Sequence, residues 1–152
     1  MKRSEVDRTK LSPMMAQYME IKDEYSEELI FYRLGDFYEL FFDDALIASR
    51  ELELTLTGKV AGLEERVPMC GVPHNNVKPY IEKLVNKGYR VAICEQLEDP
   101  KTTNKMVKRG IVDVISKGTI ADNELLNELD SSYIARNSSW FIWWMEVPWS
   151  RE

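Results

Sequence analysis

The heptapeptide "GDFYELF", residues 35–41, holds an aromatic ring and a carboxylate two positions apart. Alternate residues of a β-strand point to the same side, so Phe37 and Glu39 would share one face, with Tyr38 and Leu40 on the other. Aromatic residues also suit strands in general, and on that interpretation Glu39 merely occupies an edge position. The functional interpretation needs the ring and the carboxylate to act together.

A ring beside a carboxyl group suits the recognition of weakened base pairs in DNA. Wedging a ring between base steps from the minor groove costs about a few kcal/mol of unstacking. Stacking of a base on the ring returns roughly 1–3 kcal/mol. Insertion is therefore favoured where pairing is already weak, as at a mispair. The neighbouring carboxyl group can then hydrogen-bond the displaced base.

Four carboxylates close together suggest a second chemistry, the metal-dependent cleavage of phosphodiesters. They are Asp36, Glu39, Asp43 and Asp44, and magnesium sites use such clusters. In a strand followed by a helix, however, these side chains would not all converge. Asp43 and Asp44 are also favoured at a helix start by the helix dipole. We therefore expect no catalytic residue among them.

Patterns for other cofactor chemistry are missing from the sequence. Gly58-Lys59 lacks the upstream glycine and the following hydroxyl residue of a phosphate-binding P-loop, so we expect no ATP hydrolysis and no bound cofactor. Two cysteines, Cys70 and Cys94, and one histidine, His74, are fewer than the four or so ligands of a structural zinc. We interpret His74 as a hydrogen-bonded loop residue and Cys94 as a small core residue.

The composition is that of a globular protein of one domain. The chain has 152 residues, of which 44% are hydrophobic and 30% charged. The net charge of −6 argues mildly against non-specific binding of nucleic acid, but residues 101–117 carry +4 and the rest −10. The amino terminus lacks the apolar core of a signal peptide, and no apolar run is long enough to span a membrane. We expect a cytoplasmic protein with no membrane partner.

Strands alternate with helices in the sequence pattern, which predicts an α/β domain. Helical spacing of apolar residues and short apolar runs between turn residues distinguish the two kinds of element. The predicted helices cover residues 13–25, 42–52 and 77–85, and a short helix follows a capping box at 119–122. The predicted strands cover 29–33, 37–41, 53–57, 89–97 and 111–116. Two prolines predict an irregular segment at "PMCGVPHNN", 68–76, and residues 98–110 form a predicted basic loop.

Three stretches of the chain resemble one known family. They are "TKLSPMMAQYMEIK" with "LIFYRLGDFYELFFDDA", "PMCGVPHNNVKPYIEKLVNKGYRVAICEQLEDP", and "KRGIVDVISKGTIADNELL". In order and spacing they are similar to the amino-terminal, mismatch-binding domain of the DNA mismatch repair protein MutS. The likeness covers about residues 9–135, and Phe-x-Glu within "GDFYELF" is the family's signature for mismatch recognition. The resemblance implies a mixed β-sheet flanked by α-helices, in agreement with the α/β prediction.

The resemblance also implies roles for individual residues. Phe37 would insert from the minor groove and stack on the mispaired base, and Glu39 would hydrogen-bond that base. Leu34 and Met69 match apolar positions that lie close to DNA in the family. The implied partner is mismatched double-stranded DNA, and other mismatch repair proteins are further candidate partners.

Three basic residues after "EQLEDP" are candidates for contacts to phosphates of the DNA backbone. They are Lys105, Lys108 and Arg109, and a solvated loop is the alternative interpretation. Recognition of a mispair depends on DNA shape and deformability more than on positive charge, so a net-acidic domain is compatible with it. We expect the resulting binding to be sensitive to salt.

The predicted organisation has three parts. Residues 1–12 form a flexible amino terminus, residues 13–130 a MutS-like mismatch-recognition domain, and residues 131–152 the start of a connector-like segment that runs into an atypical tail. Full-length family members are several times longer and carry a carboxy-terminal ATPase that uses ATP and magnesium. That region has no counterpart here, so the resemblance implies a DNA-binding fragment without enzyme activity.

All four tryptophans lie in "WFIWWMEVPW", residues 140–149. This stretch is either a natural hydrophobic strand or tail, or the foreign end of a truncated chain. It supports a rival hypothesis, a truncated protein-interaction module that binds or sequesters repair partners without DNA activity of its own. Deleting residues 137–152 separates the two hypotheses, because loss of partner binding would favour the rival.

Overall fold

A computed structural model of the protein describes residues 2–99, 101 and 107–118. The predicted helix after residue 119, the tryptophan-rich tail and the predicted domain limit at residue 130 lie outside these residues. The rival hypothesis of a protein-interaction module depends on the tail and therefore lies outside the described residues as well. Within the described residues, no helix is long and apolar enough to cross a membrane.

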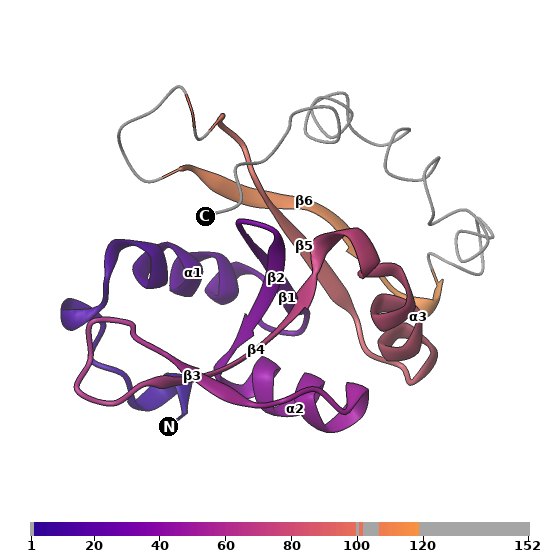
Figure 1. Ribbon diagram of the computed structural model, residues 1–152, viewed down its shortest axis with the longest axis horizontal. Coiled ribbons are helices and arrows are strands. Elements are labelled where there is room, and N and C mark those ends of the chain that lie inside the picture. The colour runs from indigo at the N-terminus through magenta and orange to yellow at the C-terminus, as the bar shows by residue number, and fades with distance from the viewer. Residues whose placement is uncertain (1, 100, 102–106, 119–152) are drawn as a thin grey trace.

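A six-stranded mixed sheet organises the described part of the chain (Figure 1). Its strands are β1 Leu29–Leu34, β2 Phe37–Phe41, β3 Thr57–Lys59, β4 Val67–Pro73, β5 Val91–Gln96 and β6 Arg109–Ile115. The order across the sheet is β3-β4-β2-β1-β5-β6, with β1 and β5 parallel and the other neighbours antiparallel. The predicted α/β class with a mixed sheet is confirmed. The apolar strand β5 lies inside the sheet, as its composition predicts.

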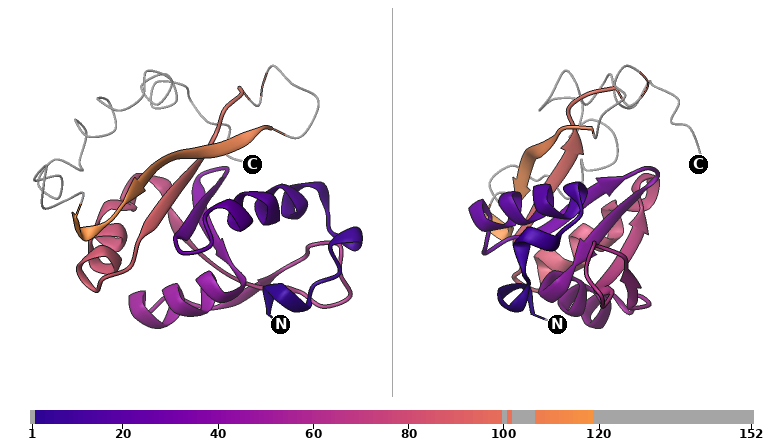
Figure 2. Two further views of the ribbon diagram at one scale, coloured as in Figure 1. Left: turned by 180° about the vertical axis from the view of Figure 1, so that it is seen from behind. Right: turned by 90° about the vertical axis from the view of Figure 1, so that its left-hand side faces the viewer.

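Helices pack on both faces of the sheet (Figure 1, Figure 2). Within the described residues they are α1 Pro13–Glu24, α2 Phe42–Leu52 and α3 Lys78–Asn86, so the three helices predicted at 13–25, 42–52 and 77–85 are confirmed. Short 3-10 turns lie at Arg3–Glu5, Arg8–Lys10 and His74–Asn76. On one face, α1 packs with Ile30, Tyr32, Phe41, Ala92 and Cys94. On the other face, α2 and α3 pack with Phe31, Tyr38, Leu40, Val72 and Ile93.

Strand β2, which carries "FYELF", follows a tight turn and continues into α2 without a connecting loop. A two-residue loop joins β1 to β2, and Gly35 occupies its first position with φ of +58°, where glycine is favoured in tight hairpins. At the other end β2 runs directly into α2. Phe42 makes this junction in the left-handed region, with φ of +55°, which is rare for a bulky residue. Its buried ring lies 6.4 Å from that of Tyr18.

The prediction of an irregular segment at 68–76 is wrong, because β4 runs through both prolines as far as Pro73. Proline lacks an N–H and is tolerated where a strand has no neighbour on one side. Pro68 pairs only with β3 and Pro73 only with β2, since the two neighbours overlap along β4 at Met69 alone. Each proline therefore lies on an edge, although β4 as a whole is an inner strand.

The strand predicted at 53–57 is also misplaced, because β3 begins only at Thr57. Glu53 and Leu54 instead close the end of α2. Glu53 caps the helix with φ of +56°, and the Leu54 amide donates to the Ser49 carbonyl at 3.0 Å. The predicted basic loop at 98–110 is likewise too long, since β6 begins at Arg109.

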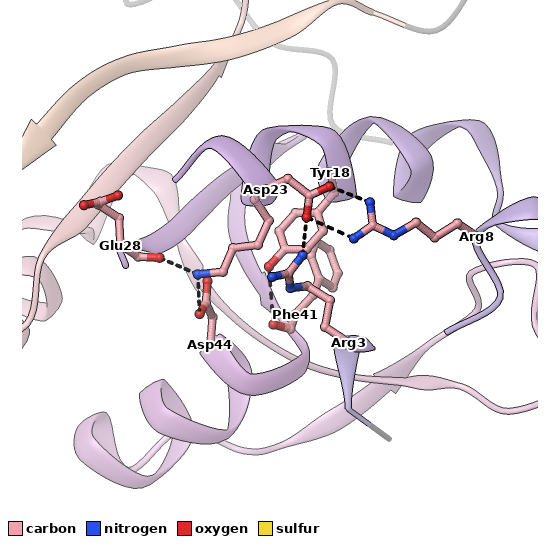
Figure 3. A network of polar contacts seen from close by, with 8 residues as sticks. Arg3, Arg8, Tyr18, Asp23, Glu28, Phe41 and Asp44 are labelled. Atoms are coloured by element: carbon pink, nitrogen blue, oxygen red, sulfur yellow. Dashed lines mark hydrogen bonds and ion pairs between the residues drawn. The ribbon is translucent and has the colours of Figure 1, made fainter. Parts of the chain in front are cut away.

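Residues of the amino terminus contact α1 (Figure 3). Arg3 and Arg8 both donate to the Asp23 carboxylate on α1, and Arg8 contacts both of its oxygens. These guanidinium groups, Arg8 first, lower the pKa of Asp23 to about 2. Further on, the Ser12 amide donates to the Ala61 carbonyl at 2.8 Å.

Candidate nucleic-acid interface

Phe37 is the exposed aromatic residue of β2. Its side chain is 47% exposed, whereas Tyr38 and Phe41 in the same strand are 2% and 0% exposed. Tyr38 and Leu40 belong to the core under α2 and α3, and Phe41 to the core under α1. By strand alternation Phe37 and Glu39 therefore share one face, as predicted, and it is the face on which α1 packs.

Glu39 is ion-paired on this face. Its Oε1 accepts a hydrogen bond from Nζ of Lys59 at 2.8 Å, and the two side chains are 15% and 28% exposed. The same Nζ lies 6.0 Å from the centre of the Phe41 ring. Lys59 was missed by the sequence prediction, which considered it as part of an incomplete P-loop pattern. It lies instead at the end of β3, two strands away from Glu39.

Gly71 lies opposite Glu39 in β4 and makes room for the side chains of Glu39 and Phe37. A Cβ atom built on Gly71 would lie 3.5 Å from Cγ of Glu39 and 4.0 Å from Cδ1 of Phe37. The ring and the carboxylate therefore lean over the backbone of β4. A glycine within a strand pattern indicates such a close approach, but the two prolines that flank Gly71 predict an irregular segment at this position.

The two apolar candidates lie on either side of this pair. Leu34 is the direct partner of Phe37 across the β1–β2 hairpin, and Met69 pairs with Phe41. Both side chains are partly buried and pack against the core under α1. Residues directly opposite each other across strands point to the same face, so Leu34 adjoins Phe37 there.

The basic candidates lie at the same end of the sheet. Tyr32 of β1 pairs with Cys94 of the parallel strand β5, so Leu34, two residues further along β1, is level with Gln96. Leu34 pairs with Phe37 on one side, and Gln96 pairs with Arg109 on the other. Arg109 and Phe37 therefore lie at the same level across the sheet. Phe37 and Arg109 are three strand spacings apart, roughly 14 Å. Lys108 is exposed beside Arg109. Lys105 lies outside the described residues.

Arg109 already holds structural contacts. Its Nε donates to the Arg33 carbonyl at 2.9 Å, and one terminal nitrogen donates to Oε1 of Gln17 at 3.4 Å. The guanidinium also lies 5.2 Å from the centre of the Tyr32 ring, a cation–π contact. These bonds tie β6 to β1 and α1, so this side chain supports the end of the sheet on which Phe37 lies.

A buried polar group supports β2 from the opposite face. The Tyr38 hydroxyl donates to Oε1 of Glu95, and NH1 of Arg33 lies 3.7 Å from Oε2 of the same carboxylate. Arg33 and Glu95 are both fully buried. Burial raises the pKa of Glu95 to about 7 and lowers the pKa of Arg33, because desolvation outweighs their mutual attraction. Tyr38 separates Phe37 from Glu39 in the chain, so this group fixes the backbone between them.

The carboxylates at 36–44 do not form a metal site. Asp44 is buried and accepts a hydrogen bond from Nζ of Lys22 at 3.0 Å (Figure 3). It also accepts one from the Ile30 amide at 3.0 Å. Glu39 is instead paired with Lys59. Among the described residues, no group of three or more His, Cys, Asp or Glu side chains could hold a metal ion.

His74 lines a hollow of about 300 Å³ beside the Phe37 ring, together with Asp36, Pro73 and Asn75. Its Nδ1 and its backbone N–H both lie 2.8 Å from the Asp36 carbonyl, so the expected hydrogen-bonded role of His74 is confirmed. Burial lowers the pKa of His74. The expected core position of Cys94 is also confirmed, since it is fully buried.

The fold and this site define a small α/β domain that presents an aromatic–acid pair at one end of a mixed sheet. The family model for MutS domain I matches residues 12–124 of the chain. The chain belongs to the MutS domain I family, and the resemblance found in the sequence is confirmed.

Its curated relatives are DNA mismatch repair proteins. The chain is 61% identical over 124 residues to DNA mismatch repair protein MutS of Clostridium beijerinckii, a match that covers 82% of the chain and 13% of the relative. The MutS of Acetivibrio thermocellus is 56% identical over 124 residues, covering 82% and 14%. That of Listeria welshimeri is 56% identical over 127 residues, covering 84% and 15%. The chain thus corresponds to a small part of each of these proteins.

Proposed function

We propose that this chain binds mispaired duplex DNA, with Phe37 as the wedge and Glu39 as the group that hydrogen-bonds the displaced base. The observation that carries the proposal is the exposure of Phe37, 47%, in a strand whose other aromatic side chains are buried. Full burial of such a ring contributes roughly 1.5–3 kcal/mol. A ring that is left about half exposed forgoes a large part of this, so the position favours a ligand over a role in the core.

The backbone of the DNA would lie along the end of the sheet that carries Phe37. Leu34 would support the ring from β1, and Met69 lies on the same face further along β4. The exposed Lys108 is the better candidate for a phosphate contact, because Arg109 is engaged with the Arg33 carbonyl and Tyr32. The proposal assigns no catalysis to this chain. The ATPase of MutS proteins lies in other regions of the full-length protein.

A titration of the 152-residue chain at low salt tests this function. One duplex carries a single G·T mispair and its matched control is identical except for that pair. Tighter binding of the mispaired duplex is the expected result. Equal binding of both duplexes would contradict the proposal for the chain on its own.

Gly71→Val is expected to lower the preference for the mispair by about tenfold, or roughly 1.4 kcal/mol. Its γ-methyl groups would displace the Glu39 and Phe37 side chains, which already lie 3.5 and 4.0 Å from a Cβ atom at this position. Gly71→Ala is the matched control, because its Cβ alone makes ordinary contacts. The measurement is the ratio of dissociation constants for matched and mispaired duplexes. An unchanged ratio in Gly71→Val would show that the two side chains do not need this space.

A further inference from the structure

Glu39 presents an electrostatic difficulty for the proposed function. A carboxylate that enters a groove of DNA comes close to phosphates, and like charges at short distance destabilise the complex. The chain as a whole is also acidic, with a net charge of −6. Something in the protein has to offset the charge of Glu39 and keep its side chain in a fixed direction.

Lys59 meets both requirements. Its Nζ donates to Oε1 of Glu39 at 2.8 Å in a partly buried setting, where the pair is less screened than at the open surface. A carboxylate has a second oxygen, Oε2, which can accept a hydrogen bond from a base while Oε1 is held. The Lys59 ammonium thus offsets the negative charge of Glu39 and leaves Oε2 as the oxygen that can accept a hydrogen bond from a base.

The sheet is built so that this contact can form. Lys59 ends the short strand β3, and β4 separates β3 from β2. At the position of β4 opposite Glu39 stands Gly71, which has no side chain to block the carboxylate. The Lys59 ammonium lies 6.0 Å from the buried Phe41 ring, a contact that holds it on this face.

From this arrangement we infer that Lys59 is a positioning residue for mispair recognition, acting through Glu39 rather than as one more phosphate contact. The inference rests on the proposed function, because it specifies how the Glu39 group is prepared. The two roles of Lys59 differ in what they change. A phosphate contact strengthens binding of matched and mispaired DNA equally, whereas a positioning residue changes the ratio between them.

The test compares Lys59→Met with the unaltered chain in titrations of a G·T duplex and its matched control. Lys59→Met keeps a long apolar side chain and removes the charge. Because a hydrogen bond to a charged group is lost, we expect the ratio of the two affinities to fall by about tenfold. Lys59→Arg should restore most of the ratio. Lys83→Met removes the same charge from an exposed position on α3, on the opposite face, and should leave the ratio unchanged.

A double variant and the salt dependence of binding distinguish the possible outcomes of this test. In a Glu39→Gln background, Lys59→Met should cause no additional change in the ratio, because the partner through which it acts is gone. An equal loss for both duplexes, with a salt dependence reduced by about one phosphate, would overturn the inference and make Lys59 a backbone contact. If the unaltered chain shows no preference at all, the proposed function itself fails, and the inference falls with it.

Discussion

Replacing Phe37 with alanine is expected to abolish the preference for mispaired DNA while the protein stays folded. Stacking of a base on an aromatic ring contributes roughly 1–3 kcal/mol, so the ratio of affinities should fall by about 5- to 150-fold. The fold should survive, because the ring is 47% exposed and the core residues of β2 are its neighbours Tyr38, Leu40 and Phe41. Binding of the matched duplex should change much less.

A second exposed apolar residue provides the control for Phe37→Ala. Leu46 on α2 is 42% exposed and lies on the helical layer away from Glu39 and Lys59. Leu46→Ala removes a similar exposed apolar surface and should leave the preference intact. Circular dichroism and thermal unfolding of both variants establish whether they are folded. An unfolded Phe37→Ala protein would mean that Phe37 serves the core, and the wedge hypothesis would lose its basis.

The positions of Phe37 and Glu39 could be predicted from the sequence because strand alternation is a local property. A tight turn at Gly35 precedes the strand, and a side-chain period of two then determines which residues share a face. The structure confirms that Tyr38 and Leu40 are buried on the other side. The α/β class could be predicted for the same reason, since alternating apolar patterns are visible in the sequence without any tertiary information.

Lys59 and Gly71 could not be predicted, because their roles depend on strand order. Lys59 reaches Glu39 only because β4 returns between β3 and β2, and no local pattern indicates that pairing. Because β4 contains two prolines, the sequence pattern predicted an irregular segment in its place. Proline excludes a central strand in general, but Pro68 and Pro73 each face a side where β4 has no neighbour. The offset between β3 and β2 along β4 is a feature of the tertiary structure. The position of Gly71 opposite Glu39 depends on the same strand pairing.

The basic candidates illustrate the same limit. A run of positive charge predicts a phosphate-binding loop or a solvated one, and the sequence does not distinguish the two. The structure adds a third role for Arg109, whose hydrogen bond to the Arg33 carbonyl joins β6 to β1. A residue that looks like a DNA ligand from its charge alone thus also stabilises the platform that holds Phe37.

Arg33→Met is expected to destabilise the protein by roughly 3–5 kcal/mol at pH 8, because it leaves the buried Glu95 carboxylate without its cationic neighbour. The Arg33 and Glu95 groups are 3.7 Å apart and both fully buried. The cost should be smaller at pH 5. The pKa of Glu95 is raised to about 7 from an ordinary value of 4.5, so at pH 5 the folded protein holds a proton there and no buried negative charge remains.

The direction of the pH effect follows from proton binding. Between about pH 4.5 and 7 the folded state holds a proton on Glu95 that the unfolded state has released. The contribution of Glu95 to the free energy of unfolding is therefore present below pH 4.5 and is lost as the pH rises through 7. Arg33→Met should steepen this loss. The lowered pKa of His74 is caused mainly by burial and in part by the charge of Arg33, and it acts in the opposite direction. Arg33→Met should therefore also reduce this opposing effect.

Urea unfolding followed by circular dichroism, at pH 5, 6, 7 and 8, measures this difference. In a Glu95→Gln background, the cost of Arg33→Met should lose most of its dependence on pH, because the buried carboxylate that faces Arg33 is absent. A pH-independent cost in the presence of Glu95 would show that Arg33 acts through packing against the Tyr38 ring, 5.7 Å from its guanidinium, and not through the carboxylate. Since Tyr38 lies between Phe37 and Glu39, milder variants of this buried group should also weaken mispair preference before they unfold the domain.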